Sequence, residues 1–421
     1  MENPNSRIKK GRFYHGWVIL AACLTVITAN VGIIFSFGVF FKSLEEEFGW
    51  TRALTSGVFS LSSLLSSVFV VVGGWNLDRY GPRVIFTVMG FSTALGLFLT
   101  SQASTLVHLY LSYSLLLAIG TGASYVVVAS TVSRWFARRR GLAIAIATSG
   151  GGLGPIIMTP VAAYLISSYG WRTSYLIMGL MALFIIVPCA QLLRKVPSKA
   201  TALTEGERLE LINWGSPEES GSNEAKAHSL SQAVKTRNFW LFVFIWLFFA
   251  YTLYMVLSHV VRHGIDMGLT TMQAGTVLSM IGGASIIGRL VMGRVSDSKG
   301  RKQVAMICAL FLAVAMLFLT MASSLWTLYL FAVIFGLSFG GFSPPMVALV
   351  GETFGLRYLG AIMGVIETGW CAGAALGPAL TGHIFDIQGS YYLSFLSGVI
   401  SMLTVIVLIR FLKAPRLERG T

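Results

Sequence analysis

Two charged side chains stand at unusual places in this sequence. Arg289 lies within the apolar stretch 269–293, and no other Lys or Arg lies well inside such a stretch. A permanent cation at membrane depth is unfavourable unless it faces a cavity or a bundle interior, where it marks a substrate or ion path. A guanidinium group binds a carboxylate through two coplanar hydrogen bonds. Arg289 therefore predicts a site for a small organic anion; the alternative is a structural arginine paired with an acid or with helix-end carbonyls.

Glu367 is a candidate proton-coupling group, because it is the only one of the 17 acidic residues well inside an apolar stretch. At 1.5 Å per helical residue, Glu367 lies about 10 Å from Gly360, and Arg289 lies about 12 Å from Asp297, so their depths are similar. A desolvated carboxyl group takes up a proton readily, and a nearby arginine opposes this. Glu367 and a substrate carboxylate are expected to compete for Arg289; a static ion pair between the two residues is the alternative.

His259, near the end of the stretch 238–261, is a second proton candidate. Histidine titrates close to physiological pH, which suits proton transfer. An ordinary hydrogen-bonded or interfacial histidine is the alternative.

Long apolar runs must position these groups. The chain has 421 residues, of which 55% are hydrophobic and 11% charged, with a mean hydropathy of +0.74, which excludes a water-soluble domain. Twelve runs are each long enough to cross a bilayer about 30 Å thick. They span residues 16–41, 53–75, 84–107, 109–133, 142–169, 173–193, 238–261, 269–293, 303–321, 324–350, 361–385 and 390–409. We therefore predict an all-α membrane protein with twelve transmembrane helices.

The net charge of +14 is distributed along the chain in a way that indicates a membrane protein rather than a nucleic-acid-binding one. With the N-terminus inside, 26 of the 31 Lys and Arg residues fall in inside segments. This bias predicts cytoplasmic termini and an integral, multi-pass protein of the plasma (inner) membrane, with the bilayer as a partner and no nucleic acid. The N-terminus lacks a short apolar core with a cleavage site, so the first span is expected to be retained.

An internal repeat divides the chain into two halves. Asp297 follows Asp78 by 219 residues, and six positions match at this offset. The other five pairs are Gly74 and Gly293, Gly81 and Gly300, Gly122 and Gly341, Gly141 and Gly360, and Gly170 and Gly389. Because each half has six spans, the repeats keep the same orientation. We predict an N-terminal half at 1–193, a cytoplasmic linker at 194–237 and a C-terminal half at 238–421.

The loop GWNLDRYGPR, from Gly74 to Arg83, and its echo GRVSDSKGRK, from Gly293 to Lys302, resemble the cytoplasmic signature of the major facilitator superfamily. This resemblance covers all twelve spans and implies the fold of that superfamily. It further implies that Asp78, Arg79 and Asp297 latch the arrangement closed towards the inside. The alternative is that these residues only set topology and folding.

A narrower resemblance rests on RWFARRRGLAIAIATSGGGLGP, from Arg134 to Pro155, together with GRLVMGRVSD and GVFFKSLEEEFGW. These segments are similar to the oxalate/formate antiporter and monocarboxylate transporter branch. There, an arginine four residues before the signature glycine engages the substrate carboxylate, and Arg289 and Gly293 have this spacing. Trp370 stands where oxalate transporters carry a second cation, so one carboxylate is favoured over two.

This sequence also departs from the pattern of that branch at positions that concern proton coupling. Phe35 and Ser285 replace the lysine and the acid of animal-type monocarboxylate transporters, so the coupling mechanism of those proteins is not carried over. Tyr125, Tyr254 and Asn30 fall in helices that line the cavity of related transporters. The expected substrate-binding set is Arg289, Tyr125, Tyr254, Asn30, Trp370 and Ser285, with packing as the alternative for each polar residue.

The expected function is alternating-access transport of small monocarboxylates such as lactate, pyruvate or formate, with proton coupling and a functional monomer. The main rival is an efflux antiporter for drugs or other metabolites. Gly150, Gly154 and Pro155 match part of a fifth-helix antiporter motif, but Met158 and Thr159 replace its following glycine pair. The apolar stretches contain no HExxH, paired-aspartate or Ser/His arrangement, so a membrane-embedded enzyme, a metal site and a cofactor are not expected. A non-transporting receptor would be expected to carry a signalling domain.

Overall fold

The computed structural model describes residues 15–49, 52–136, 139–194 and 228–413. These ranges are helical and contain no strand. The first three spans are α1 (His15–Phe48), α2 (Arg52–Tyr80) and α3 (Pro82–Ser101). The fourth is built from α4 (Leu106–Leu109), the π-helical η1 (Tyr110–Leu115), α5 (Leu116–Thr121) and α6 (Ser124–Trp135). It is followed by α7 (Arg140–Thr148) and α8 (Gly150–Leu192).

The second half begins with the short α11 (Leu230–Val234) and continues with six long helices. They are α12 (Arg237–Asp266), α13 (Thr271–Lys299), α14 (Arg301–Thr320), α15 (Leu325–Phe354), α16 (Leu359–Gln388) and α17 (Tyr392–Phe411). Most of the predicted linker lies outside the described residues, and α11 and the start of α12 form its last part.

The twelve predicted spans are confirmed. Eleven stretches of the described chain are long and apolar enough to cross a membrane, and one of them, Arg140–Leu192, is 53 residues long. This stretch holds two spans, because Gly170 interrupts α8 with a φ of 77° that side-chain-bearing residues rarely adopt. At the matching place of the second half, Gly389 ends α16 with a φ of 64°, so a glycine with positive φ separates two helices in each half, although the ψ angles differ, 164° at Gly170 and 15° at Gly389.

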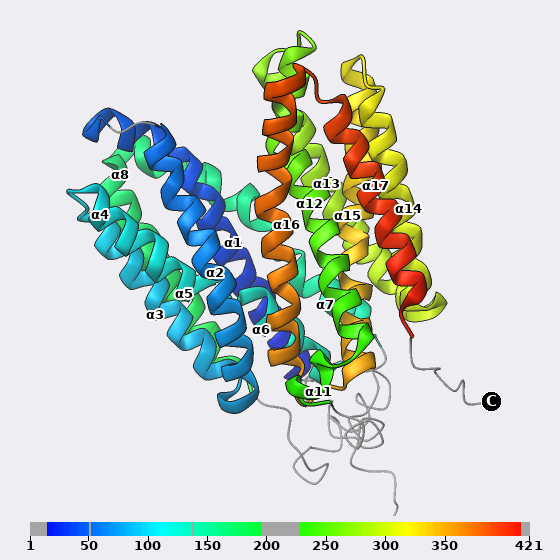
Figure 1. Ribbon diagram of the computed structural model, residues 1–421. Helices are drawn as coiled ribbons and strands as arrows, with labels where there is room; N and C mark the ends of the chain where they lie inside the picture. The colour runs from blue at the N-terminus through cyan, green and yellow to red at the C-terminus, as the bar shows by residue number, and fades with distance from the viewer. Residues whose placement is uncertain (1–14, 50–51, 137–138, 195–227, 414–421) are drawn as a thin grey trace, which may run out of the picture.

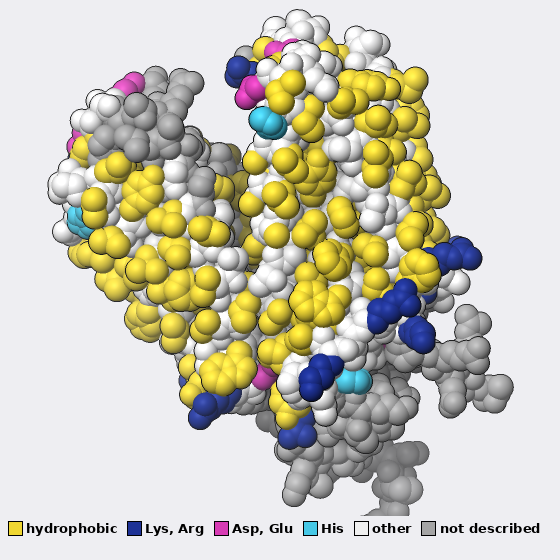
Figure 2. All heavy atoms as spheres, viewed as in Figure 1, with side chains coloured by type: hydrophobic (Ala, Val, Ile, Leu, Met, Phe, Trp, Pro, Cys, Tyr) yellow, Lys and Arg dark blue, Asp and Glu magenta, His cyan; other side chains and the backbone are white. Residues whose placement is uncertain are grey.

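The two halves lie side by side and diverge towards one end (Figure 1). We call this the open end; Figure 2 shows a cleft there between the halves. At the other end, which we call the closed end, α2 meets α16 and α7 meets α13. The backbones approach closely at both crossings: a Cβ added to Gly360 would lie 2.5 Å from the Gly74 carbonyl oxygen, and one added to Gly141 would lie 2.7 Å from that of Gly293.

Glycines also bring the helices within each half together, in a pattern that repeats. A Cβ at Gly154 on α8 would lie 2.6 Å from the Thr28 carbonyl oxygen on α1. A Cβ at Gly373 on α16 would collide with the Leu247 carbonyl oxygen on α12. Gly373 follows Gly154, and Leu247 follows Thr28, by the same 219 residues. The glycine cluster that begins at Gly150 therefore serves close helix packing, which small residues allow in membranes.

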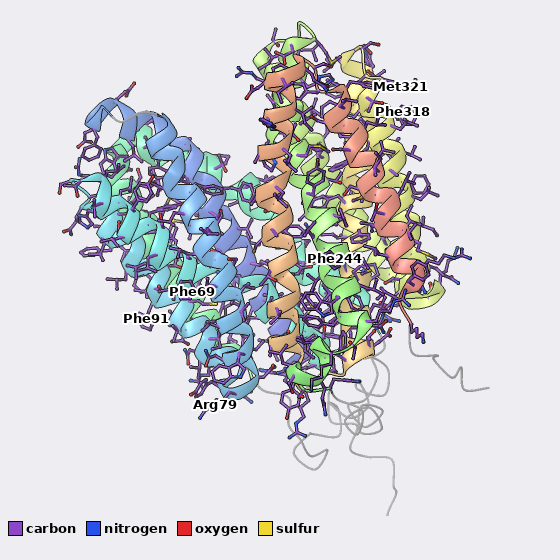
Figure 3. All side chains as sticks on the ribbon, in the orientation of Figure 1. Phe69, Arg79, Phe91, Phe244, Phe318 and Met321 are labelled. Atoms are coloured by element: carbon purple, nitrogen blue, oxygen red, sulfur yellow. The ribbon has the colours of Figure 1, made fainter. Side chains whose placement is uncertain are left out.

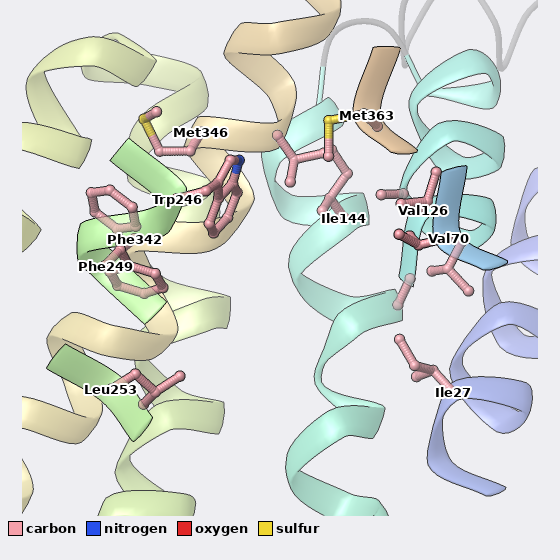
Figure 4. Packing of buried hydrophobic residues seen from close by; sticks show 14 of the residues in the cluster. Ile27, Val70, Val126, Ile144, Trp246, Phe249, Leu253, Phe342, Met346 and Met363 are labelled. Atoms are coloured by element: carbon pink, nitrogen blue, oxygen red, sulfur yellow. The ribbon is translucent and has the colours of Figure 1, made fainter. Parts of the chain in front are cut away.

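Apolar side chains cover the flanks of the bundle. Phe91, Phe244 and Phe318 project from the outer face and are exposed, as expected for a lipid-facing surface (Figure 3). Inside the second half, Trp246, Phe249 and Phe342 pack against one another (Figure 4). These buried rings hold α12 against α15 and support the central face of the half.

Candidate functional site

Arg289 projects from α13 across the boundary between the halves. Its Nη1 donates a hydrogen bond to the carbonyl oxygen of Thr148, the last residue of α7. The break between α7 and α8 explains why this acceptor is available, because the amides of Gly152 and Leu153 both donate to Ser149. In this state Arg289 therefore binds a helix-end carbonyl, which was the structural alternative for it.

Space for the guanidinium comes from the neighbouring glycine. A Cβ at Gly151 would lie 3.2 Å from Arg289 Nη1 and 3.9 Å from Nη2. On another side the guanidinium carbon lies 5.5 Å from the centroid of the Phe339 ring, within the range of a cation–π contact. Arg289 is thus held between a glycine of one half and an aromatic ring of the other, and its Nε is buried without a hydrogen-bond partner in the described part of the chain.

Glu367 lies on α16 with only 7% of its surface exposed. Its Oε1 is buried and accepts no hydrogen bond from the described residues. No ion pair within 4.0 Å joins Glu367 to Arg289, and both residues lie in the described ranges. The static ion pair considered as an alternative is therefore not formed in this state. Buried charged groups are normally paired or hydrogen-bonded, so this carboxylate is unusual.

Tyr125 lies where the two halves meet. Its hydroxyl forms a hydrogen bond with the Ser343 hydroxyl, which links α6 in the first half to α15 in the second. The same tyrosine interacts electrostatically with both Arg289 and Glu367. Tyr125 thus lies at the junction of the halves, between α6 and α15.

A row of aromatic rings runs from Arg289 to Tyr254. The Phe339 ring, which faces the Arg289 guanidinium, stacks on the Phe249 ring with 6.0 Å between the ring centroids. Phe249 lies 5.9 Å from Trp370, and Trp370 lies 5.8 Å from Tyr254. We call Phe339, Phe249, Trp370 and Tyr254 the aromatic wall. Phe339, Trp370 and Tyr254 are each partly exposed. Trp370, at the place of the second cation in oxalate transporters, therefore adds an aromatic face rather than a charge.

Three of the expected site residues, Ser285, His259 and Asn30, lie outside the aromatic wall. Ser285 is 2% exposed, donates to the Gly282 carbonyl 2.7 Å away, and packs with its backbone against Gly340. His259 Nε2 lies 3.1 Å from the Pro378 carbonyl oxygen, between α12 and α16. Its ring faces Tyr391 at 5.5 Å, at the open end of the second half. In the described ranges, neither residue forms a hydrogen bond with the Arg289 side chain.

Asn30 lies within the first half. Its Nδ2 donates to the Ser124 hydroxyl at 2.8 Å, between α1 and α6, and its Oδ1 is buried without a partner among the described residues. Asn30 therefore binds Ser124, the residue before Tyr125 on α6, and is not part of the aromatic wall.

The two signature aspartates bind helix N-termini of opposite halves. Asp78 on α2 accepts from the amides of Gly360 at 3.2 Å and Ala361 at 2.8 Å, at the start of α16. Asp297 on α13 accepts from the amides of Gly141 at 2.9 Å and Leu142 at 3.0 Å, at the start of α7. A carboxylate is favoured there by the unsatisfied amides and by the helix dipole. Each contact is the repeat-related copy of the other.

Asp78 pairs with a basic residue that the expected latch did not include. Arg134 Nη2 forms the ion pair with Asp78, and Arg134 Nε donates to the Leu356 carbonyl at 3.1 Å. Arg79 is exposed at the closed end of α2 and lies over the ring of Tyr80 (Figure 3). Sequence reasoning missed Arg134 because it ends a separate span, although its place just before the basic run at 138–140 offered a signal.

A second charge network surrounds Asp297. Arg301 Nη2 lies 3.6 Å from Asp297, and Arg301 Nη1 pairs with Glu352. Arg140 is only 8% exposed and lies beside this cluster. Arg140, which ends the basic run 138–140, is therefore buried between the halves, near Gly351.

No group of three His, Cys, Asp or Glu residues in the described ranges is placed to hold a metal ion. The four cysteines, all within those ranges, are free thiols. The arrangement offers ionic and hydrogen-bonding groups at the junction of two halves.

The chain matches the Major Facilitator Superfamily over residues 19–302 and 268–421. It belongs to this superfamily of membrane transporters and is not an enzyme. Among similar proteins are human monocarboxylate transporter 12, 28% identical over 96% of this chain and 82% of that protein, and rat monocarboxylate transporter 13, 26% identical over 90% and 85%. Human monocarboxylate transporter 11 is 27% identical over 90% of this chain and 79% of its own length.

Solved structures share the fold. The transporter FucP in its outward conformation has a TM-score of 0.72 and 15% identity, over 94% of this chain and 99% of that one. The proton:xylose symporter XylE, bound to 6-bromo-6-deoxy-D-glucose, has a TM-score of 0.75 and 15% identity, over 95% and 96%. The predicted superfamily fold is confirmed.

Proposed function

We propose that this protein is a proton-coupled transporter of small monocarboxylates such as lactate, pyruvate or formate. The observation that carries the proposal is the Arg289 guanidinium, which lies between the halves with one buried nitrogen that has no partner among the described residues. A guanidinium that binds a backbone carbonyl can exchange this partner for a carboxylate, which forms stronger, charge-assisted hydrogen bonds. The names of the similar monocarboxylate transporters agree with this substrate class.

Glu367 is the proposed proton carrier. It is buried and forms no ion pair within the part of the chain that the structure describes, so it is neutralised most simply by a proton. One proton and one anion then cross together, and the membrane potential does not oppose the loaded carrier. His259, which bonds a backbone carbonyl inside the second half, is less suited to this role.

The closed end is the proposed cytoplasmic end, and the protein is proposed to be a monomer of the plasma (inner) membrane. Lys and Arg side chains gather at this end (Figure 2), as the positive-inside rule requires of a cytoplasmic face. Both termini would then be cytoplasmic. In this orientation the cleft opens outwards, and Asp78 and Asp297 act as two latches that must release before the site opens inwards. Arg134 takes the role that the sequence suggests for Arg79.

Uptake of labelled lactate into proteoliposomes under an inward proton gradient tests the proposal. We expect gradient-driven uptake that is competed by pyruvate and formate and lost in Arg289→Ala. Arg294→Ala, which removes an exposed arginine from the same helix, should retain it. If folded wild-type protein takes up no small carboxylate, the proposal is wrong and the efflux alternative gains support.

A further inference from the structure

Four basic residues come together at the closed end of the second half, where the ends of α12, α14 and α17 meet. Lys302, at the start of α14, donates from Nζ to the carbonyl oxygens of Arg410 at 2.9 Å and Leu412 at 2.7 Å, at the end of α17. Arg237 begins α12, and Lys413 follows the end of α17. We call Arg237, Lys302, Arg410 and Lys413 the basic cluster.

Contacts between the helix ends hold this arrangement in place. The Arg237 guanidinium carbon lies 5.0 Å from the centroid of the Phe411 ring, within the range of a cation–π contact. Asn238 Nδ2 donates to the Lys413 carbonyl oxygen at 3.1 Å, and the Lys413 amide donates to Asn238 Oδ1 at 3.3 Å. The starts of α12 and α14 are therefore both fixed to residues 410–413, and their cations are gathered around one helix end.

The basic cluster has no acidic partner in the described ranges. The ion pairs found there within 4.0 Å involve acids elsewhere in the molecule, and none involves a member of the cluster. Arg237, Arg410 and Lys413 are exposed, and Lys302 is half-buried. Like charges that are gathered without a counter-ion repel one another, so an anion bound among them is favoured.

The matching place of the first half carries only two cations. Arg83, which corresponds to Lys302, donates from Nε to Gln191 Oε1 at 2.7 Å, and Gln191 Nε2 donates to Thr87 Oγ1 at 3.1 Å. The residues 219 positions before the basic cluster are Val18, Arg83, Gln191 and Arg194. Because both halves have the same orientation in the membrane, the positive-inside rule alone does not explain the two additional cations of the second half.

An exposed apolar surface begins directly beside the cluster. Trp240 and Phe244 follow Arg237 by three and seven residues on α12, which places them on the same face of the helix, and both are exposed. On α17, which packs against α12, exposed apolar residues recur at every fourth position. These residues are Leu403, Val407 and Phe411. Figure 2 shows Lys and Arg side chains at this end of the second half, below a flank of hydrophobic side chains.

We propose that the basic cluster binds the headgroup of an anionic phospholipid, whose acyl chains lie along the exposed faces of α12 and α17. A phosphate group accepts charge-assisted hydrogen bonds from guanidinium and ammonium groups. Basic pockets between transmembrane helices bind such headgroups. A soluble phosphate would contact only the cations, whereas a lipid also covers the adjoining apolar faces. This binding does not depend on which substrate the carrier transports.

Native mass spectrometry of the purified protein, titrated with phosphatidylglycerol or with phosphatidylcholine, tests the proposal. Wild type should bind phosphatidylglycerol more tightly than phosphatidylcholine. In Arg237→Gln/Arg410→Gln we expect the affinity for phosphatidylglycerol to fall about 25-fold, because each basic side chain near an anionic lipid strengthens binding about fivefold. Lys302 is left unchanged, because it binds the end of α17. The control Arg294→Gln/Lys299→Gln removes two exposed cations near the end of α13 and should keep the wild-type affinity.

A second measurement locates the lipid on the wild-type protein. Phosphatidylglycerol with a photoreactive group in its headgroup should label the segments around Arg237 and Arg410, identified by mass spectrometry of peptides. An excess of unlabelled phosphatidylglycerol should prevent this labelling. The measurement needs no variant, so the proposal can be tested even if the double variant does not fold.

The outcomes distinguish a local lipid site from a general effect of charge. A loss of phosphatidylglycerol affinity in Arg237→Gln/Arg410→Gln alone, with labelling at the cluster, supports the proposal. An equal loss in both double variants overturns it, because net charge would then set the affinity. Unchanged affinity in Arg237→Gln/Arg410→Gln, equal wild-type affinity for the two lipids, or labelling confined to other segments also overturns it. None of these results bears on the proposed transport function.

Discussion

Replacing either signature aspartate by asparagine should shift the carrier away from the state described here. Asp78 accepts two backbone hydrogen bonds from the start of α16 and pairs with Arg134. Asparagine has one acceptor oxygen and no charge, so Asp78→Asn keeps at most one of these hydrogen bonds and loses the ion pair. Charge-assisted hydrogen bonds contribute about 1.5–3 kcal/mol each. We estimate a loss of about 1–3 kcal/mol for the closed end, which changes the ratio of the two conformations about 5- to 150-fold.

Distances between spin labels measure this shift. Labels at Val107 and Met321, both exposed at the open end, report the separation of the halves once the native cysteines are replaced. In Asp78→Asn and in the repeat-related Asp297→Asn, we expect a larger population with a shorter distance, as the open end closes. The double variant should shift further than either single one, because the two contacts share no residues. Asp386→Asn is the matched control. A distance distribution that stays the same in both latch variants would refute the reasoning.

Three further predictions concern the site and the open end. Gly151→Ala should weaken lactate binding several-fold, because the added Cβ would lie 3.2 Å from Arg289 Nη1. Gly275→Ala is the control and should not weaken binding, because a Cβ there would have nothing within 4 Å. Equal lactate affinities of the two variants in a binding titration would contradict this prediction. Glu367→Gln should retain lactate exchange but lose proton-driven accumulation, and His259→Ala should keep both; accumulation that is unchanged in Glu367→Gln would exclude Glu367 as the proton carrier. Hydrogen bonds from Arg172 and Trp171 hold the pKa of Glu47 below its ordinary value of 4.5. The ionised Glu47 therefore stabilises the folded protein above pH 4.5, and this stabilisation is lost as the pH falls through the lower pKa of the folded state. The melting temperature of wild type should therefore converge on that of Glu47→Gln below about pH 4.5, and a gap that persists at lower pH would argue against this role.

Hydropathy and repetition predict the fold well, because the bilayer imposes both. Each span must satisfy its backbone within itself, so apolar length alone locates the twelve helices. The 219-residue offset also relates the two aspartate contacts to each other, since Gly360 and Gly141, which Asp78 and Asp297 bind, are themselves 219 residues apart. What the repeat does not reveal is which helix end receives each aspartate.

The site is predictable where a residue is chemically rare and unpredictable where packing decides. Arg289 and Glu367 stand out because a charge in an apolar stretch needs a reason. Ser285 and His259 cannot be placed from sequence, because a small rotation of α13 or α12 decides whether a polar group faces the centre or a neighbouring helix. The role of the Thr148 carbonyl as the acceptor for Arg289 also cannot be predicted from the sequence. This carbonyl is available because the hydrogen-bonding pattern changes locally between α7 and α8.

The most direct test of the central claim is the dissociation constant of lactate for the purified protein, compared among wild type, Arg289→Ala and Arg294→Ala. If Arg289 binds the carboxylate, Arg289→Ala should lose about 10- to 150-fold in affinity, the equivalent of one hydrogen bond to a charged group. Arg294→Ala should bind lactate as wild type does. Equal affinity of wild type and a folded Arg289→Ala variant would contradict the account.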